Sequence, residues 1–274
     1  MHEPYFPDLG IVYPEQPDAH MVSVPKVREL VVDENYPFLE KTFSFRFMRR
    51  LMHLGVFTLM FVAGFFIHGM RVEGRKILRK NRKLLKNGAM TICNHVNRWD
   101  YLFVLLAVRY RMMFFPAYKE NLKSRDMDFI RLAGGIPVPD EISTMKYFNK
   151  AFDEIVQKKI WIHAYPESTR FDYFNYLRPF KKGVFSMAHR YKLPIIPIAI
   201  CYRKSHFPFT LFNYSKTKKR GVEYPLITAK IGEPVLLDES LGRKEAIQKL
   251  RKDTHEAMIN LMGIKNNPYP AEGD

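Results

Sequence analysis

Residues 88–100 read GAMTICNHVNRWD, a short apolar run followed by a histidine and a carboxylate five positions apart. An apolar run of this length after Gly88 is typical of a buried strand, and we expect that strand to deliver His95 to its carboxyl end. Histidine titrates near neutral pH and can accept a proton from a hydroxyl group, while the carboxylate of Asp100 would fix its tautomer. The stretch therefore predicts a general base and its orienting partner.

Outside this stretch, apolar runs typical of strands alternate with segments of helical periodicity. The predicted strands are 88–93, 112–118, 160–165, 195–202 and 224–231, and the predicted helices are 77–85, 99–110, 144–158, 184–191 and 243–262. Such alternation is typical of an α/β fold. We expect a mixed, mostly parallel sheet flanked by helices, with reactive groups at the carboxyl ends of the strands.

Length, charge and cysteine content narrow the class of protein. The chain of 274 residues can form one catalytic domain and an accessory segment. The formal net charge of +16 indicates an anionic partner: nucleic acid, a membrane surface or a phosphorylated ligand. Two cysteines make no disulfide framework, and residues 1–30 lack the pattern of a signal peptide. We therefore expect a cytosol-facing domain, with Cys93 as a small buried hydrophobe rather than a nucleophile.

The first part of the chain divides into a proline-rich stretch and an apolar one. Recurring prolines predict an extended arm over residues 1–45. Residues 51–70 contain no Asp, Glu, Lys or Arg and are long enough to cross a bilayer core of about 30 Å. We predict a membrane-embedded helical segment over 46–70, with a buried helix of a soluble core as the alternative, and a catalytic domain over 71–274.

Two basic stretches help to identify the class of anionic partner. Residues 71–86 hold eight Lys or Arg against one acid, which would place the catalytic domain on the cytoplasmic side and attract anionic lipids at roughly 1 kcal/mol per cation. A solvated helix face is the alternative. Residues 203–220 mix cations with aromatics, a combination that can bind single-stranded nucleic acid but also suits an interfacial loop. The apolar segment favours membrane lipids as partners and no nucleic acid.

Further motifs follow the histidine stretch in a fixed order. Residues 134–140 read GGIPVPD, residues 165–170 read YPESTR, residues 180–183 read FKKG, and residues 193–200 read LPIIPIAI. Together with Asn-His-x4-Asp at 94–100, this order resembles the glycerolipid acyltransferases, in their lysophosphatidate (1-acylglycerol-3-phosphate) acyltransferase branch. The resemblance covers about residues 72–200.

Two positions depart from the family pattern. The family block Pro-Glu-Gly-Thr-Arg has glycine where this chain has Ser168, and the block Gly-x-Ile-Pro-Val-x-Arg has arginine where this chain has Asp140. The second departure bears on the acceptor lipid rather than on the chemistry. It leaves open an acceptor without phosphate, such as a glycolipid or an amino-acid lipid.

The resemblance implies transfer of a fatty acyl group from an acyl-CoA or acyl carrier protein thioester to a free hydroxyl of a lysolipid, above all 1-acylglycerol-3-phosphate, to give phosphatidate. It implies His95 as general base and Asp100 as its orienting partner, with no cofactor beyond the thioester co-substrate. The residues implied in substrate binding are Asn94, Glu167, Thr169, Arg170, Lys182 and Gly183.

The residue chemistry agrees with this role. A thiolate leaves readily, and no serine lies in a nucleophile-elbow sequence, so direct attack by the acceptor is favoured. Arg170 offers a planar fork for a phosphate, and Glu167 could bind acceptor hydroxyls or hold Arg170 in place; a purely structural ion pair is the alternative. No metal-ligand spacing occurs in the sequence. A non-catalytic basic membrane-binding protein is the competing hypothesis, but it would need no base followed by Glu and Arg.

Overall fold

The computed structural model describes residues 4–21, 29–124, 126–213, 218–219 and 221–272. Its centre is a seven-stranded sheet in the order β1-β7-β6-β2-β5-β3-β4. The strands are β1 (Arg71–Glu73), β2 (Met90–Cys93), β3 (Met113–Ala117), β4 (Gly135–Pro137), β5 (Trp161–Ala164), β6 (Ile195–Arg203) and β7 (Leu226–Ile231). Neighbouring strands are parallel except β6 and β7. The predicted mixed, mostly parallel α/β sheet is therefore confirmed.

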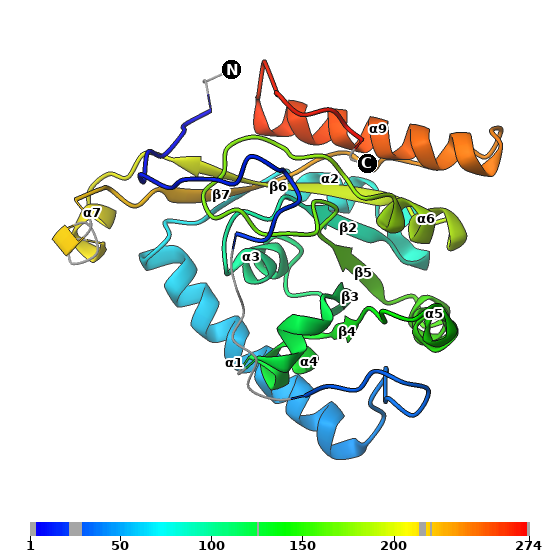
Figure 1. Ribbon diagram of the computed structural model, residues 1–274. Coiled ribbons are helices and arrows are strands. Elements are labelled where there is room, and N and C mark those ends of the chain that lie inside the picture. The colour runs from blue at the N-terminus through cyan, green and yellow to red at the C-terminus, as the bar shows by residue number, and fades with distance from the viewer. Residues whose placement is uncertain (1–3, 22–28, 125, 214–217, 220, 273–274) are drawn as a thin grey trace.

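Helices cover both faces of this sheet, and Figure 1 shows α9 along one face and α3 on the other. The helices are α1 (Phe43–Phe66), α2 (Arg75–Lys80), α3 (Asp100–Ala107), α4 (Met127–Ala133), α5 (Ile142–Gln157), α6 (Lys182–Arg190), α7 (Phe209–Phe212) and α9 (Arg243–Met262). Short 3₁₀ helices, η1 (Leu84–Asn87) and η2 (Lys119–Lys123), lie in the connections.

β2 shows why the sheet is covered on both faces. Its four residues are all buried; Met90 and Ile92 pack in the apolar cluster with α5, α6 and α9, while Cys93 packs in the cluster with α3. Successive side chains of a strand point to opposite faces, so a strand that is apolar at consecutive positions is stable between two helical layers. Cys93 is accordingly a buried packing residue, and burial raises the pKa of its thiol well above the usual value.

The elements differ from the sequence prediction in several places; the short helices α4 and α7, for example, were not predicted. β1 and β4 were not predicted, because each spans three residues and shows no alternation long enough to recognise. The helix predicted over 77–85 is interrupted: α2 ends at Lys80 and η1 begins at Leu84.

The arm before α1 lies on the domain. Described residues 4–21 form no helix or strand and run along the loop 165–181. The Tyr13 hydroxyl donates to the carbonyl oxygen of Asp172 at 2.9 Å, and Asp18 pairs with Lys181 at 3.1 Å.

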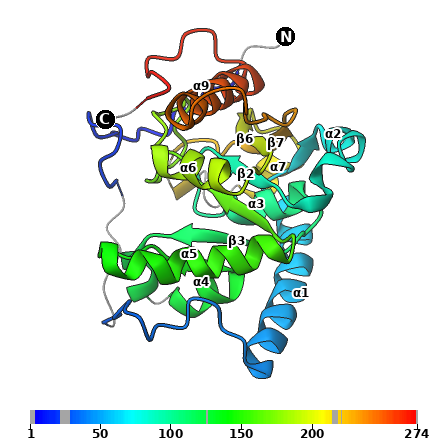
Figure 2. The same ribbon diagram turned by 90° about the vertical axis from the view of Figure 1, so that its right-hand side faces the viewer.

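α1 runs along the flank of the molecule, as Figure 2 shows most clearly, and packs on α3 and α4. In the part of the chain that the structure describes, it is the helix that is long and apolar enough to cross a membrane. Its apolar window is only 17% buried, and exposed side chains such as Leu54 and Phe61 face away from the domain. A contiguous exposed apolar face of this length indicates contact with a membrane or a partner.

We expect the protein to stay in the membrane pellet in 1 M NaCl, where the Debye length is about 3 Å, because apolar contact is not screened by salt. Replacing Leu54 and Phe61 with serine should release it into the supernatant. Replacing Val12 and Ile142, which are exposed apolar residues outside α1, should not. Release of the unmodified protein by salt alone would show that only charge retains it.

Candidate active site

The turn between β2 and α3 brings the predicted base and its partner together. Nδ1 of His95 lies 3.1 Å from Oδ2 of Asp100, the first residue of α3. The same oxygen accepts the backbone N–H groups of Val96 at 2.7 Å and Asn97 at 2.8 Å. An oxygen that accepts two backbone N–H groups acts as an acceptor toward the imidazole as well, so Nδ1 donates to it and Nε2 is left as the proton acceptor. The imidazole is 22% exposed, whereas Asp100 is fully buried.

Burial sets the charge of this pair. Burial, and after it the positive charge of Arg170, lower the pKa of His95 to about 3 from 6.5. The imidazole is therefore neutral at physiological pH and able to accept a proton. Burial also raises the pKa of Asp100, and the two backbone N–H groups oppose that shift.

Aromatic packing fixes the plane of the imidazole. The ring of Tyr165, the residue after β5, stacks on His95 with centroids 4.0 Å apart and planes 18° apart. Behind it, His163 is fully buried and its Nδ1 lies 2.9 Å from the Thr91 hydroxyl. His163 is thus a packed histidine of the core.

Glu167 supports His95 through the backbone. Its Oε2 accepts the N–H of His95 at 2.8 Å, and its Oε1 accepts the N–H of Arg178 at 2.9 Å. The Arg178 guanidinium forms an ion pair with Oε2 at 3.1 Å, and both side chains are fully buried. The suggestion that Glu167 holds Arg170 is therefore wrong: its cationic partner is Arg178.

Sequence reasoning missed Arg178, because its partners come from two separate segments, residues 167–171 and the arm before α1. Besides Glu167, the guanidinium donates to the Thr169 hydroxyl at 2.7 Å, to the Thr169 carbonyl, and to the Pro17 carbonyl at 2.9 Å. It also lies 4.0 Å from the centre of the Phe171 ring. No local spacing signals this arrangement; only the position of an arginine between the two family blocks could have drawn attention to it.

Arg170 lies beside the base. The N–H of Phe171, the next residue, donates to the carbonyl oxygen of His95 at 3.0 Å. The Nε of Arg170 pairs with Asp172 at 2.9 Å. The carboxyl ends of β2 and β5 thus bring together His95, Asp100, Glu167, Thr169 and Arg170, as the sequence predicted, although their roles remain predictions.

The other predicted binding residues are Asn94, which directly precedes His95, and two residues at the start of α6. Asn94 is fully buried, and its side-chain amide exchanges hydrogen bonds of 2.8 and 3.0 Å with the backbone of Ile200 in β6. It therefore joins two strands. Lys182 and Gly183 are exposed at the start of α6, which the hydrogen bond from the Lys181 N–H to the Pro166 carbonyl at 2.7 Å holds near the loop.

The two departures from the family pattern have visible consequences. Ser168 has φ 63°, in the left-handed region that favours glycine. Asp140 is exposed and pairs with Lys119 at 2.7 Å. Among the described residues, no group of three His, Cys, Asp or Glu side chains could hold a metal ion.

Fold and site together define an α/β protein with a neutral histidine and a buried carboxylate at the carboxyl end of a central strand. A family model described as Acyltransferase matches residues 69–201, which is just under half of the chain. A Caenorhabditis elegans protein with the provisional name 1-acyl-sn-glycerol-3-phosphate acyltransferase acl-1 is 41% identical over 76 residues. That match covers 28% of this chain and 26% of the relative, so it spans about a quarter of the relative's length.

A solved structure shares the fold. The 1-acyl-sn-glycerophosphate (LPA) acyltransferase PlsC from Thermotoga maritima superposes with a TM-score of 0.50 at 17% sequence identity. The alignment covers 84% of this chain and 86% of that one.

Replacing Ser168 with glycine should raise the free energy of unfolding by up to about 1 kcal/mol, because it relieves a left-handed conformation that costs a non-glycine residue roughly 1–2 kcal/mol. The matched control is Ser186→Gly inside α6, which should lower stability by about 0.5–1 kcal/mol. Chemical denaturation measures both. A loss of stability in Ser168→Gly would contradict the expectation.

The lowered pKa of His95 can be measured without a substrate. Diethyl pyrocarbonate reacts with neutral imidazole, so the reaction rate falls as pH drops through the pKa. We expect the midpoint at His95, followed by mass spectrometry, to lie well below 6.5. Arg170→Gln should move the midpoint upward, since it removes a charge that lowers the pKa. A midpoint near 6.5 in the unmodified protein would show that the imidazole is not desolvated.

Proposed function

We propose that this protein transfers a fatty acyl group from an acyl thioester to the free hydroxyl of a lysolipid, with 1-acylglycerol-3-phosphate as acceptor and phosphatidate as product. The observation that carries the proposal is the 3.1 Å contact between His95 and Asp100 beside Arg170. The match of residues 69–201 to the Acyltransferase family model supports it, as do the substrates in the names of the two relatives.

In the proposed mechanism, Nε2 of His95 removes the proton of the acceptor hydroxyl as its oxygen attacks the thioester carbonyl. The carbon–sulfur bond then breaks, and the thiolate takes the proton back from the imidazolium. Asp100 stabilises that imidazolium through Nδ1. General-base catalysis of this kind contributes about 10²- to 10⁴-fold to the rate. Because a thiolate leaves readily, no covalent acyl-enzyme is required.

Arg170 would bind the acceptor phosphate. Its Nε is paired with Asp172, and among the described carboxylates no other forms an ion pair with the guanidinium. The pair with Asp172 would hold the side chain in one orientation while the terminal nitrogens contact phosphate oxygens in a forked arrangement. Glu167 and Thr169 would act indirectly, because Arg178 occupies both side chains.

A second acceptor class is favoured by one observation. Asp140 stands where the family has arginine, and it pairs with Lys119 at 2.7 Å. The pair neutralises a lysine that could otherwise attract a phosphate. An acceptor without phosphate, such as a glycolipid or an amino-acid lipid, would suit this arrangement.

The proposal also includes the acyl donor, the lipid partners and the side of the membrane on which the reaction takes place. The donor would be acyl-CoA or an acyl carrier protein thioester, and the other partners would be membrane lipids. The eight cations of residues 71–86 would face anionic headgroups and place the catalytic domain on the cytoplasmic side.

The test uses purified protein, a labelled acyl thioester, and lysolipids with and without a terminal phosphate. We expect His95→Ala to lose at least about 100-fold in turnover, because it removes the general base. His189→Ala, in α6, is the matched control and should retain full turnover. If His95→Ala keeps more than about a tenth of the activity, the histidine is not the base.

The same panel identifies the acceptor. If lysophosphatidate is used, Arg170→Ala should weaken its use by about 1.5–3 kcal/mol, the contribution of a charge-assisted hydrogen bond. If a phosphate-free lipid is preferred, Asp140→Arg should shift the preference toward lysophosphatidate. Acylation of no panel member by folded protein would favour a non-catalytic membrane-binding role.

A further inference from the structure

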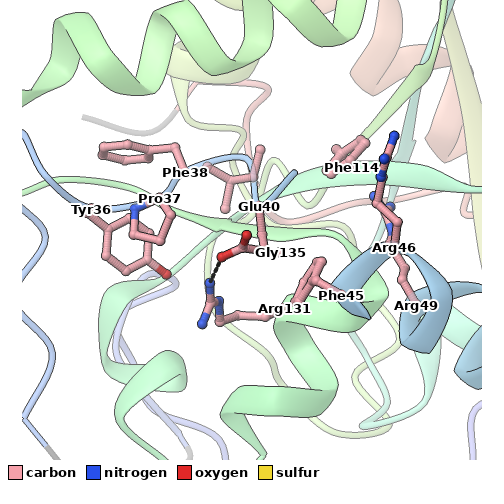
Figure 3. A pocket seen from close by; sticks show the side chains of 11 residues that line it. Tyr36, Pro37, Phe38, Glu40, Phe45, Arg46, Arg49, Phe114, Arg131 and Gly135 are labelled. Carbon is pink, nitrogen blue, oxygen red and sulfur yellow. Dashed lines mark ion pairs between the residues drawn. The ribbon is translucent and has the colours of Figure 1, made fainter. Parts of the chain in front are cut away.

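A small cavity of about 40 Å³, open to solvent, lies at the edge of the sheet beside the start of α1 (Figure 3). Aromatic rings form much of its wall: Tyr36, Phe38, Phe45 and Phe114. Its charged lining residues are Arg46, Arg49, Arg131 and Glu40. The cavity thus combines an apolar wall with an excess of positive charge.

Arg49 is a buried cation without a counter-charge. Its side chain is on the domain side of α1, and the residue is only 8% exposed. One Nη donates to the Met113 carbonyl at 3.0 Å, and the guanidinium lies 3.8 Å from the centre of the Phe114 ring. Its Nε is buried without a hydrogen-bond partner, and no carboxylate of the described residues pairs with it.

A buried charge is costly unless an opposite charge and hydrogen bonds compensate it. The carbonyl of Met113 satisfies one donor of the guanidinium but supplies no net negative charge. The unused Nε of Arg49 therefore points to an anion as the missing partner. Arginine binds phosphate and carboxylate groups in a planar, forked geometry, which makes either group a chemically suitable partner.

The remaining charges of the cavity do not cancel this excess. Glu40 pairs with Arg131 at a long 3.9 Å, the contact drawn in Figure 3, and its Oε1 also accepts the N–H of Thr42 at 3.2 Å. Arg46 is exposed at the rim. Three arginines against one carboxylate leave a net positive lining.

Exposed apolar side chains next to Arg46 in the sequence would also suit an amphiphilic ligand. Phe43 and Phe47, on either side of Arg46, stack on each other and are 79% and 56% exposed. They begin the exposed apolar face of α1. A ligand with a phosphate in the cavity could therefore lay an acyl chain along this face without exposing it to water.

The cavity is separate from the base. It lies against Phe114, Gly135 and Ile136, in the amino-terminal halves of β3 and β4, whereas His95 follows the carboxyl end of β2. In the sheet, β5 and β3 separate β2 from β4. Three strand spacings amount to about 14 Å.

We propose that this cavity binds the phosphate group of an anionic ligand at a site distinct from the catalytic centre, with Arg49 as the buried contact and Arg46 at the rim. A lipid headgroup and free phosphate share this chemistry. The site would hold the start of α1 to a phosphate-bearing surface, independently of any acceptor bound near Arg170.

The experiment measures binding to the full chain in detergent by calorimetry. The probes are inorganic phosphate, dihexanoyl phosphatidate below its micellar concentration, and uncharged dihexanoylglycerol. Arg49→Met should weaken binding of the phosphate-bearing probe at least about tenfold, equivalent to about 1.4 kcal/mol. Arg50→Met is the matched control: it removes the same charge from the neighbouring, exposed position of α1 and should leave binding unchanged.

A second variant tests the proposal even if Arg49→Met fails to fold. Arg46→Gln alters only an exposed side chain at the rim and should also weaken binding. Binding of inorganic phosphate that depends on Arg49 and Arg46 would identify a free anion as sufficient, while binding of dihexanoyl phosphatidate alone would identify a lipid. Three results would overturn the proposal. They are equal binding of the phosphate-bearing probe by Arg46→Gln and Arg50→Met, binding of dihexanoylglycerol as strong as that of dihexanoyl phosphatidate, and no binding of any probe by the unmodified protein. Arg170→Ala should leave this binding intact, which separates it from the proposed acyl transfer.

Discussion

The loop after β5, which packs against His95, depends on one buried ion pair, between Glu167 and Arg178. Removing two charges from water costs several kcal/mol per ion, so such a pair is stable only when the remaining donors and acceptors are also satisfied. Here Glu167 accepts two backbone N–H groups and Arg178 donates to Thr169 and Pro17. Leaving either charge unpaired would cost about 3–5 kcal/mol. The pair thereby fixes the backbone of His95, the loop 165–181 and the arm relative to one another.

The geometry around His95 likewise depends on one buried carboxylate that accepts several hydrogen bonds. One oxygen of Asp100 receives two backbone N–H groups and the imidazole, so the turn after β2 and the tautomer of the base are set by a single group. Tyr165 limits rotation of the ring from one face. The imidazole of His95 is therefore oriented by neighbours that are themselves fixed in the core, which would reduce the reorganisation that a reaction at this residue required.

Local patterns were sufficient to predict the strands that carry the site. β2, β5 and β6 are continuous apolar runs, and they deliver His95 and the loop after Ala164 to one edge of the sheet. β4 escaped prediction because three residues that include glycine and proline carry little strand signal. The partner of Glu167 also escaped, because the ion pair depends on how the loop folds back and not on spacing along the chain. Nor could the sequence show that Arg49 is buried, since its neighbours Arg46 and Arg50 are exposed on the same helix.

The segments on either side of α1 are both attached to the catalytic domain. Before it, Phe38 packs in the core against Phe148, and Lys41 pairs with Glu154 of α5 at 2.7 Å. After it, β1 joins the sheet beside β7. A helix that crossed a bilayer would have its two ends in different aqueous compartments, and one domain cannot occupy both. Any contact of α1 with a bilayer would therefore be monotopic in this arrangement: the helix would enter one leaflet from the side of the α/β domain and return to that side.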